Sequence, residues 1–237
     1  MPPGAVGRMH GWLRDIGDFF FPRCCLVCGR VLLHDEEFLC CHCLLDLPRT
    51  DYGRVTDNPM EQLFYGKLQV ERCAAYFFFT EGGDYRRLIH DIKYKGEKEC
   101  GAYLGALFAR ENAATGLFDS VDYLVPVPLH PRKWRKRGYN QSEWIARGIS
   151  EATGIPVCTE LLECVTDRQS QTHKGIYERW LSTHESFTAL PDVIPAESHV
   201  LLVDDVVTTG ATLLACGKAL AASGISRISI CALSLAK

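Results

Sequence analysis

The stretch Ser198-His-Val-Leu-Leu-Val-Asp-Asp-Val-Val-Thr-Thr-Gly-Ala-Thr212 decides the fold of this chain. Its first part, Val200 to Val203, is a short apolar run rich in β-branched residues, which is typical of a strand buried on both faces. Two acids, Asp204 and Asp205, come where that strand is expected to end. The Ala- and Leu-rich segment 213–223 follows the turn and predicts a helix. A strand, a turn and a helix in this order indicate an α/β sheet.

The turn between strand and helix has the chemistry of a sugar-phosphate site. Ligands bind at the carboxyl ends of strands in open α/β sheets, and a helix N-terminus favours a phosphate because its backbone N–H groups are unpaired. The hydroxyls of Thr208, Thr209 and Thr212 add hydrogen-bond donors, and small residues let the backbone approach the ligand. Paired carboxylates do not bind phosphate, but they accept hydrogen bonds from sugar hydroxyls or help to hold a divalent cation.

Two other interpretations fit parts of this stretch. A buried strand with an acidic turn and a Thr-capped helix needs no ligand. A Walker B strand of an NTPase also ends in acids, but it requires a Gly-x-x-x-x-Gly-Lys-Ser/Thr loop elsewhere in the chain. The nearest candidate, Gly217-Lys218, is followed by Ala219. The paired acids with Thr-Thr-Gly-x-Thr therefore favour phosphate binding.

The same stretch resembles the phosphoribosyl pyrophosphate (PRPP) loop of type I phosphoribosyltransferases. The resemblance implies that the two acids contact the ribose hydroxyls, that the Thr-rich turn surrounds the 5′-phosphate, and that PRPP binds together with Mg²⁺. It also implies an α/β fold with a mainly parallel sheet. The implied site comprises Asp204, Asp205, Val206, Val207, Thr208, Thr209, Gly210, Ala211 and Thr212.

The composition is that of an ordinary globular protein. The chain has 237 residues, of which 47% are hydrophobic, and a formal net charge of −3, which suits one domain and a small module. Only a local basic patch would bind nucleic acid on such a chain. No apolar run has the length of a membrane span, and the N-terminus lacks the apolar core of a signal peptide. We therefore expect a cytoplasmic protein without membrane insertion, whose twelve cysteines are reduced thiols or metal ligands.

Two Cys-x-x-Cys pairs lie near the N-terminus. Each pair can bind one metal ion from a tight turn, and two pairs complete a tetrahedral thiolate site of the structural zinc type. Neighbouring Cys24, Cys41 and His42 are competing ligands, and free cysteines in a small core or a redox pair are the alternatives. The shared spacing favours a zinc site made by Cys25, Cys28, Cys40 and Cys43.

Residues 20–47 are thus predicted to form a zinc ribbon-like module, residues 48–69 a linker, and residues 70–237 the main domain. A short helix is expected at 12–21, before the module. In the main domain the pattern predicts strands at 70–80, 123–129, 157–165, 200–203 and 225–235, the last of which closes the sheet. Helices are predicted after Tyr85, at 101–113, at 141–151 with Trp144 inward, and at 213–223. On the first of these helices we interpret Arg86, Arg87, Lys93 and Lys95 as a solvated face, with a phosphate contact as the alternative.

Residues 130–140 are predicted to be a basic loop after the strand 123–129, which stops at its prolines. In a parallel sheet this loop would lie beside the Asp204 to Thr212 turn, where its cations suit a pyrophosphate. Trp134 and Tyr139 among the bases also suit single-stranded nucleic acid, and a solvated loop is the alternative. The five clustered bases are Arg132, Lys133, Arg135, Lys136 and Arg137.

This segment narrows the resemblance to the ComF family of phosphoribosyltransferase-like proteins. Pro126-Val-Pro-Leu129, Arg137-Gly-Tyr-Asn-Gln141 and Lys93-Tyr-Lys-Gly96 fit its pattern, as does an N-terminal four-cysteine zinc module. The resemblance adds Gly138 and Asn140 to the pyrophosphate segment, and it places Gln171 and Arg179 in a mobile flap over the substrate. Ser182 is a departure, because ComF-like chains usually carry Asn there.

Two functions follow from the resemblance. As a ComF-like protein the chain would bind PRPP or another phosphorylated ribose and act in natural competence, handling incoming single-stranded DNA with a DNA-uptake helicase or processing proteins as partners. As an active phosphoribosyltransferase it would instead transfer phosphoribose from PRPP to a nitrogen acceptor. A pocket for the acceptor base distinguishes the two, and none is identifiable from the sequence.

Overall fold

The computed structural model describes residues 22–80, 82–165 and 186–237. Its helices are α2 (Cys41–Leu45), the 3₁₀ turn η1 (Tyr52–Arg54), α3 (Pro59–Gln62), α4 (Arg86–Tyr94), α5 (Lys98–Glu111), α6 (Pro131–Arg137), α7 (Gln141–Thr153) and α9 (Ala211–Ala222). Its strands are β1 (Cys73–Phe79), β2 (Tyr123–Pro126), β3 (Leu162–Val165), β4 (Ser186–Ala189), β5 (His199–Val207) and β6 (Arg227–Ala236). The helix expected at 12–21 lies outside the described residues.

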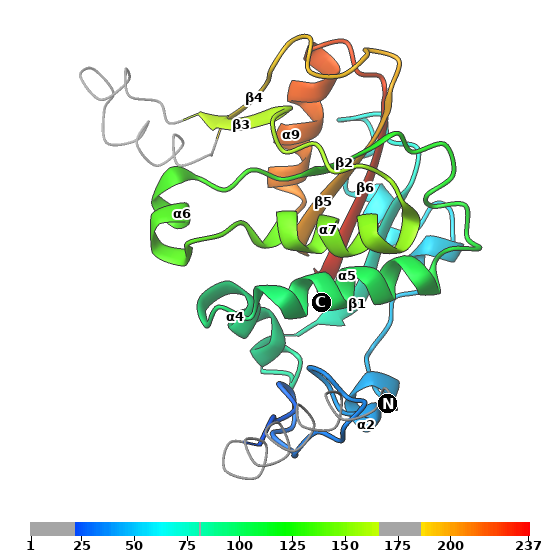
Figure 1. Cartoon of the computed structure of the whole chain (residues 1–237). Coiled ribbons are helices and arrows are strands. Elements are labelled where there is room, and N and C mark those ends of the chain that lie inside the picture. The colour runs from blue at the N-terminus through cyan, green and yellow to red at the C-terminus, as the bar shows by residue number, and fades with distance from the viewer. Residues whose placement is uncertain (1–21, 81, 166–185) are drawn as a thin grey trace, which may run out of the picture.

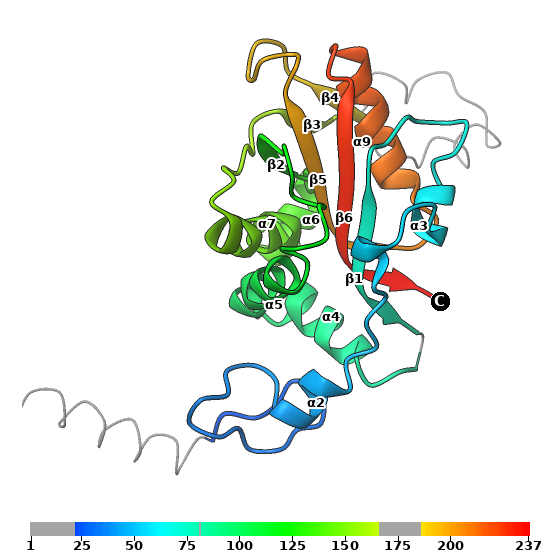
Figure 2. The same ribbon diagram turned by 90° about the vertical axis from the view of Figure 1, so that its right-hand side faces the viewer.

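Among the described residues, four strands form a parallel sheet in the order β1-β6-β5-β2. The predicted α/β class with a mainly parallel sheet is therefore confirmed. Strands β3 and β4 form a separate antiparallel pair. Helices α4, α5 and α7 cover one face of the sheet, and α9 and α3 cover the other (Figures 1 and 2). Each face has its own buried apolar cluster, so the strands between them are buried on both sides.

Strand β6 lies inside the sheet, between β1 and β5, so the prediction that it closes the sheet was wrong. Its residues from Ile228 to Leu235 are all buried, as expected for a strand with neighbours on both sides. Sequence periodicity identifies a buried strand but carries no information about its order in the sheet. Its place between β1 and β5 is set by packing between segments that are distant in the chain.

Strand β5 is longer than predicted and includes both acids. It pairs with β6 as far as Val207, whereas its pairing with β2 ends at Val203 opposite Pro126. Asp204 and Asp205 therefore belong to a strand that has a neighbour on one side only. The last β2 hydrogen bond to β5 is donated by the Val127 N–H to the Val203 carbonyl, and beyond it β5 continues with β6 alone.

Residues 130–140 are not a loop throughout, because Pro131–Arg137 form the helix α6. His130 caps this helix by accepting a hydrogen bond from the Arg132 backbone N–H, Pro131 occupies its first turn, and Gly138 ends it with φ 79°. A proline at the start and a left-handed glycine at the end are helix signals that this segment carries in its sequence. The clustered charge led to the wrong prediction of a loop.

The expected strand at 157–165 is also shorter, since Val157 makes only an isolated bridge to Leu124 and β3 begins at Leu162. Trp144 is half-buried, not inward, and the Lys98 ammonium lies 4.6 Å from its ring centroid.

The segment 48–69, expected as a linker, packs against the main sheet. Met60 and Phe64 on and after α3 are fully buried in the cluster that also contains α9. Asn58, 1% exposed, accepts hydrogen bonds from the backbone N–H groups of Met60 and Glu61. Its amide donates to the carbonyls of Val55 and Cys73, both at 2.9 Å. One side chain thus starts α3 and fastens the segment to β1.

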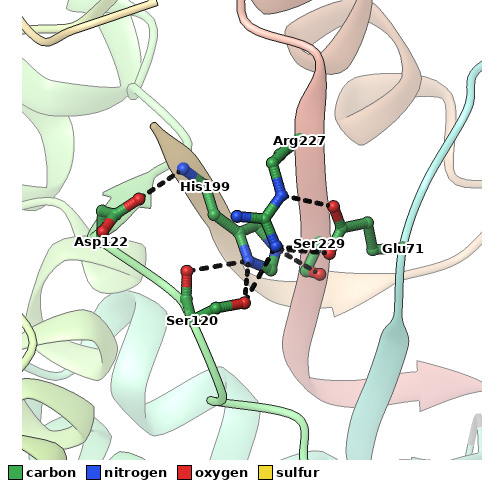
Figure 3. Close-up of polar contacts among 6 residues, drawn as sticks. All are labelled: Glu71, Ser120, Asp122, His199, Arg227 and Ser229. Carbon is green, nitrogen blue, oxygen red and sulfur yellow. Dashed lines mark hydrogen bonds and ion pairs between the residues drawn. The ribbon is translucent and has the colours of Figure 1, made fainter. Parts of the chain in front are cut away.

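A polar network lies at the opposite edge of the sheet, where the strands begin (Figure 3). His199 is 2% exposed, and its side chain forms a hydrogen bond of 2.9 Å with the Ser229 hydroxyl. Its backbone N–H donates to Asp122 at 2.7 Å. Arg227 donates to Glu71 at 2.8 Å and to the Ser120 hydroxyl at 2.9 Å. Burial lowers the pKa of His199, although the Glu71 carboxylate opposes the shift, so the imidazole is neutral at neutral pH. The network joins the starts of β5 and β6 to the segments that precede β1 and β2.

None of the described helices is long and apolar enough to cross a membrane.

We expect Asn58→Ala to lower the free energy of unfolding by about 2–4 kcal/mol, because it removes a helix cap and leaves buried backbone groups unpaired. Urea denaturation measures the change. Gln62→Ala is the matched control, since this exposed side chain on the same helix donates one hydrogen bond to the Asp57 carbonyl. An equal effect of the two substitutions would contradict the role of Asn58.

Candidate functional site

The candidate site is built at the carboxyl edge of the sheet, around Asp204 and Asp205, which we call the acidic pair. After Pro126 the β2 chain leaves the ladder, with a last hydrogen bond from the Val127 N–H to the Val203 carbonyl at 2.9 Å. Asn140 holds the returning chain there by donating from its side chain to the Val127 carbonyl at 2.9 Å. The two ends of the basic segment, Val127 and Asn140, therefore lie beside the end of β5.

Asp204 contacts the start of α7. Its Oδ1 accepts a hydrogen bond from the Ser142 hydroxyl at 3.0 Å and another from the Asp205 backbone N–H at 2.9 Å. Burial and the adjacent Asp205 carboxylate raise the pKa of Asp204 to about 7, against the opposing effect of these hydrogen bonds and of Lys93. The carboxyl group is thus poised to change charge near neutral pH, which is common at functional sites.

Asp205 contacts α4 on the same side of the sheet. Its Oδ1 lies 3.0 Å from the Lys93 ammonium, and the two side chains are 12% and 21% exposed. Its backbone carbonyl accepts a hydrogen bond from the Ser234 hydroxyl of β6 at 3.2 Å. The interpretation of Lys93 as part of a solvated face was therefore wrong. Lys95 and Arg87 on the same helix pair with Asp91 instead.

Lys93 is a candidate-site residue that the sequence pattern placed on a solvated face, with a phosphate contact as the alternative. Its motif, Lys93-Tyr-Lys-Gly96, also fits the family pattern. A charged residue on an amphipathic helix predicts solvent exposure, and only the packing of α4 beside the end of β5 shows otherwise.

The turn that follows β5 presents hydroxyls and a helix N-terminus to solvent. Thr208 and Thr209 are exposed, and the Thr209 hydroxyl accepts a hydrogen bond from the Ala211 N–H at 3.4 Å. Gly210 has φ 73°, and a Cβ there would lie 3.3 Å from the Phe64 ring, so both conformation and space favour glycine. Gly210 also starts the 12-residue helix α9, which has no side-chain cap at this end within the part of the chain that the structure describes. Backbone N–H groups of its first turn are thus suited to an anion.

Helix α6, which we call the basic helix, stands beside α4 at this edge (Figure 1). None of its residues is buried, and Trp134 is 51% exposed. Arg137 donates to the Tyr94 hydroxyl at 3.2 Å, and the charged groups of Lys136 and Arg137 lie 5.4 Å and 4.9 Å from the Tyr94 ring centroid. The Arg137 hydrogen bond, opposed by some burial, lowers the pKa of Tyr94. The basic helix and α4 therefore form one surface of cations and aromatic rings.

Tyr139 and Asn140 connect this surface to the acidic pair. The Tyr139 hydroxyl donates to the Ile92 carbonyl, one residue before Lys93. The Asn140 side chain also caps α7 by accepting from the Ser142 N–H at 3.1 Å, and Ser142 in turn contacts Asp204. Of the predicted site residues, these contacts bring Asn140 to Asp204 through Ser142. Gln171, Arg179 and Ser182 lie outside the described residues.

The predicted cysteine ligands form a second candidate site. The Sγ atoms of Cys25, Cys28, Cys40 and Cys43 all lie within 4.8 Å of one another, and that of Cys28 is 3.7 Å from that of Cys40. The edge of a tetrahedron of sulfurs about 2.3 Å from zinc is about 3.8 Å, so the geometry fits such an ion. Burial opposes ionisation of Cys25, but backbone hydrogen bonds from Cys28, Cys40 and Val27 lower its pKa to about 7, which favours a thiolate ligand.

The competing ligands are placed elsewhere. Cys24 and Cys41 are exposed, and the His42 ring pairs with Asp46 at 3.1 Å. The cluster is also docked on the main domain: the Tyr85 hydroxyl donates to the Cys43 carbonyl at 2.7 Å, and the Phe38 ring lies 5.5 Å from that of Tyr103. Its buried cysteines belong to the same apolar cluster as α4 and α5.

Comparison with known proteins gives three kinds of similarity. Residues 126–237 match the family described as phosphoribosyl transferase domain. The DNA utilization protein YhgH of Salmonella typhimurium is 28% identical over 148 residues, which are 60% of this chain and 63% of that protein. Competence protein F of Haemophilus influenzae is 31% identical over 55% of this chain and 57% of its own length.

Competence protein ComFC of Streptococcus pneumoniae is 37% identical over 38% of this chain and 37% of its own length. The chain thus covers less than two thirds of each of these relatives. Among solved structures, the glutamine PRPP amidotransferase from B. subtilis, complexed with ADP and GMP, has a TM-score of 0.39 and 20% sequence identity over 56% of this chain and 26% of that one.

Proposed function

We propose that the chain binds a phosphorylated ribose and handles single-stranded DNA during natural competence, because residues 126–237 match the phosphoribosyl transferase domain family and the chain is similar to competence proteins F and ComFC. The ligand we propose is PRPP or a closely related sugar phosphate. The observation that carries the proposal is the meeting of the acidic pair, the open N-terminus of α9 and the basic helix at one edge of a parallel sheet.

Each part of that edge suits one part of the sugar. The acidic pair accepts hydrogen bonds from ribose hydroxyls, which carry donors and no charge. The backbone N–H groups and Thr hydroxyls of the turn from Thr208 to Thr212 receive the 5′-phosphate. The pyrophosphate at C1 faces the cations, among which Arg135 and Arg137 of the basic helix are proposed contacts.

The same surface suits single-stranded DNA. Four exposed bases of the basic helix surround Trp134, and Tyr94 of α4 adds a second ring that is 49% exposed. Bases stack on such rings while phosphates contact the cations between them. This concentration of positive charge on a chain with net charge −3 supplies the local patch that the overall composition lacks. DNA-uptake helicases or processing proteins are the proposed partners, and the cytoplasm is the proposed location.

An active phosphoribosyltransferase is the alternative function. It is supported by the cations of the basic helix and by Lys93 beside Asp205, because cations at this edge would stabilise a departing pyrophosphate. A nitrogen nucleophile would then attack C1 of the ribose. Incubation with PRPP and a panel of bases and amines, followed by assay of released pyrophosphate, distinguishes this enzyme from a binding protein.

For the cysteine cluster we propose structural zinc. Four thiolates leave no position open for a reactant, and the burial of three of the four ligands fits a stabilising role. The module around them is short, and metal binding would supply part of its folding free energy.

We expect Asp205→Asn and Asp204→Asn to abolish measurable binding of PRPP by calorimetry, because each removes an acceptor for a ribose hydroxyl. Asp204→Asn provides its own folding control. Because the pKa of Asp204 is raised to about 7 in the folded protein, the wild type loses stability as the pH rises toward and through that value. Asp204→Asn carries no charge there, so it should be more stable than the wild type at pH 8, with a smaller gain at pH 5. Unchanged PRPP affinity in a folded variant would remove the acidic pair from the site.

We expect the double variant Arg132→Ala, Arg135→Ala to bind single-stranded DNA more weakly and to reduce the slope of log affinity against log salt by about 1 to 2. Fluorescence anisotropy with a labelled oligonucleotide over a range of salt concentrations measures both. Arg110→Ala with Lys218→Ala is the matched control, since it removes the same charge from exposed positions on α5 and α9. Equal slopes for the two double variants would place the DNA elsewhere.

We expect elemental analysis of the purified protein to find about one zinc ion per chain. Cys40→Ser should lose the metal and destabilise the module, whereas Cys41→Ser, one residue away and exposed, should keep it. Metal content that is zero in the wild type, or equal in the two variants, would contradict the proposed ligand set.

A further inference from the structure

Lys93 places a positive charge next to the acidic pair, in contact with Asp205. Its ammonium lies 3.0 Å from Asp205 Oδ1 with only 21% of the side chain exposed. Its charge also acts on Asp204, whose ionisation it favours. A carboxylate with little exposure is costly to leave without a partner, and at 12% exposure Asp205 has this ammonium as its partner.

The ammonium is held in place by the helix that carries it. Leu88, Ile89 and Ile92 of α4 are buried against the sheet, and the Ile92 carbonyl accepts the Tyr139 hydroxyl from the chain that follows the basic helix. Lys93 therefore stands at a fixed point between the acidic pair and the proposed pyrophosphate contacts. A Lys ammonium has further N–H donors besides the one given to Asp205, and these suit phosphoryl oxygens.

This position conflicts with the Mg²⁺ that the fold family implies. A divalent cation bound at Asp205 would have to displace the ammonium or lie next to it, and like charges repel strongly at such distances in a partly buried site. Mg²⁺ also requires near-octahedral oxygen ligands and gives up its water reluctantly. A carboxylate oxygen already paired with an ammonium is a poor ligand for it.

We propose that Lys93 is the built-in cation of this sugar site, so that a ribose 5-phosphate with an anionic group at C1 binds the protein without Mg²⁺. Lys93 then joins Asp205 to the anionic group at C1, which is the bridging task a divalent cation would otherwise have. This inference rests on the proposed binding of a phosphorylated ribose. According to this inference, Lys93 determines which form of the ligand the protein binds. That form is the free anion and not its magnesium complex.

The test is calorimetric titration of the full-length protein with PRPP, once in EDTA and once in excess Mg²⁺. We expect the wild type to bind in EDTA with a dissociation constant within about threefold of that in Mg²⁺. Lys93→Met should weaken binding in EDTA by about 10- to 100-fold, the usual range for loss of a charged hydrogen-bond partner. Lys93→Arg, which keeps the charge, should retain most of the affinity.

Lys95→Met is the matched control, because Lys95 lies on the same helix, is 51% exposed and pairs with Asp91. It should bind PRPP as the wild type does. Thermal unfolding checks that each variant is folded, and Lys93→Gln, whose amide can still donate to Asp205, replaces Lys93→Met if that variant does not fold.

The wild-type titrations separate the two proposals. Binding in Mg²⁺ with none in EDTA overturns the role of Lys93 and leaves the sugar-phosphate site standing. Absence of binding in both conditions overturns the proposed site and this inference with it. Equal affinities of Lys93→Met and Lys95→Met in EDTA overturn the inference alone.

Discussion

The early end of β2 at Pro126 is the constraint on which the rest of the site depends. Strand β5 continues past that point with β6 as its single partner, so Asp204 and Asp205 are held in a regular strand and yet have one open side. Side chains from α4 and α7 contact the carboxylates. A β2 strand that continued would put a backbone ladder along that open side instead. The departure of β2 from the ladder after Val127 thus leaves space beside the acidic pair.

The departing β2 chain also arranges the charges of the site. It forms the basic helix, returns through Tyr139 and Asn140, and starts α7 beside Asp204. Acids, cations and a helix N-terminus are therefore brought to one edge by two strand ends that are neighbours in the sheet. The opposite edge carries the His199 network, in which each polar group pairs with another protein group (Figure 3). One end of the sheet is satisfied internally, and the other presents groups suited to a ligand.

The N-terminal part of the chain is more closely joined to the main domain than its composition suggests. Asn58 and Phe64 fasten the segment after the cysteine module to β1 and α9, and Phe64 touches the glycine of the Thr-rich turn. The cysteine cluster shares its apolar contacts with α4, the helix that carries Lys93. A change in the packing of this cluster would therefore act on a helix that takes part in the candidate site.

Local patterns in the sequence were sufficient for the α/β class, the four-cysteine cluster and the closeness of the two strand ends. Alternation, spacing and strand ends are properties of neighbouring residues, and parallel strands bring their carboxyl ends to the same edge. The helical form of residues 131–137 was also within reach, because its proline and glycine signals are local. The internal place of β6, the packing of α3 and the contact between Lys93 and Asp205 were decided by tertiary structure alone. Each joins residues far apart in the chain, and charge or periodicity in a short window cannot indicate which distant partner a side chain will meet.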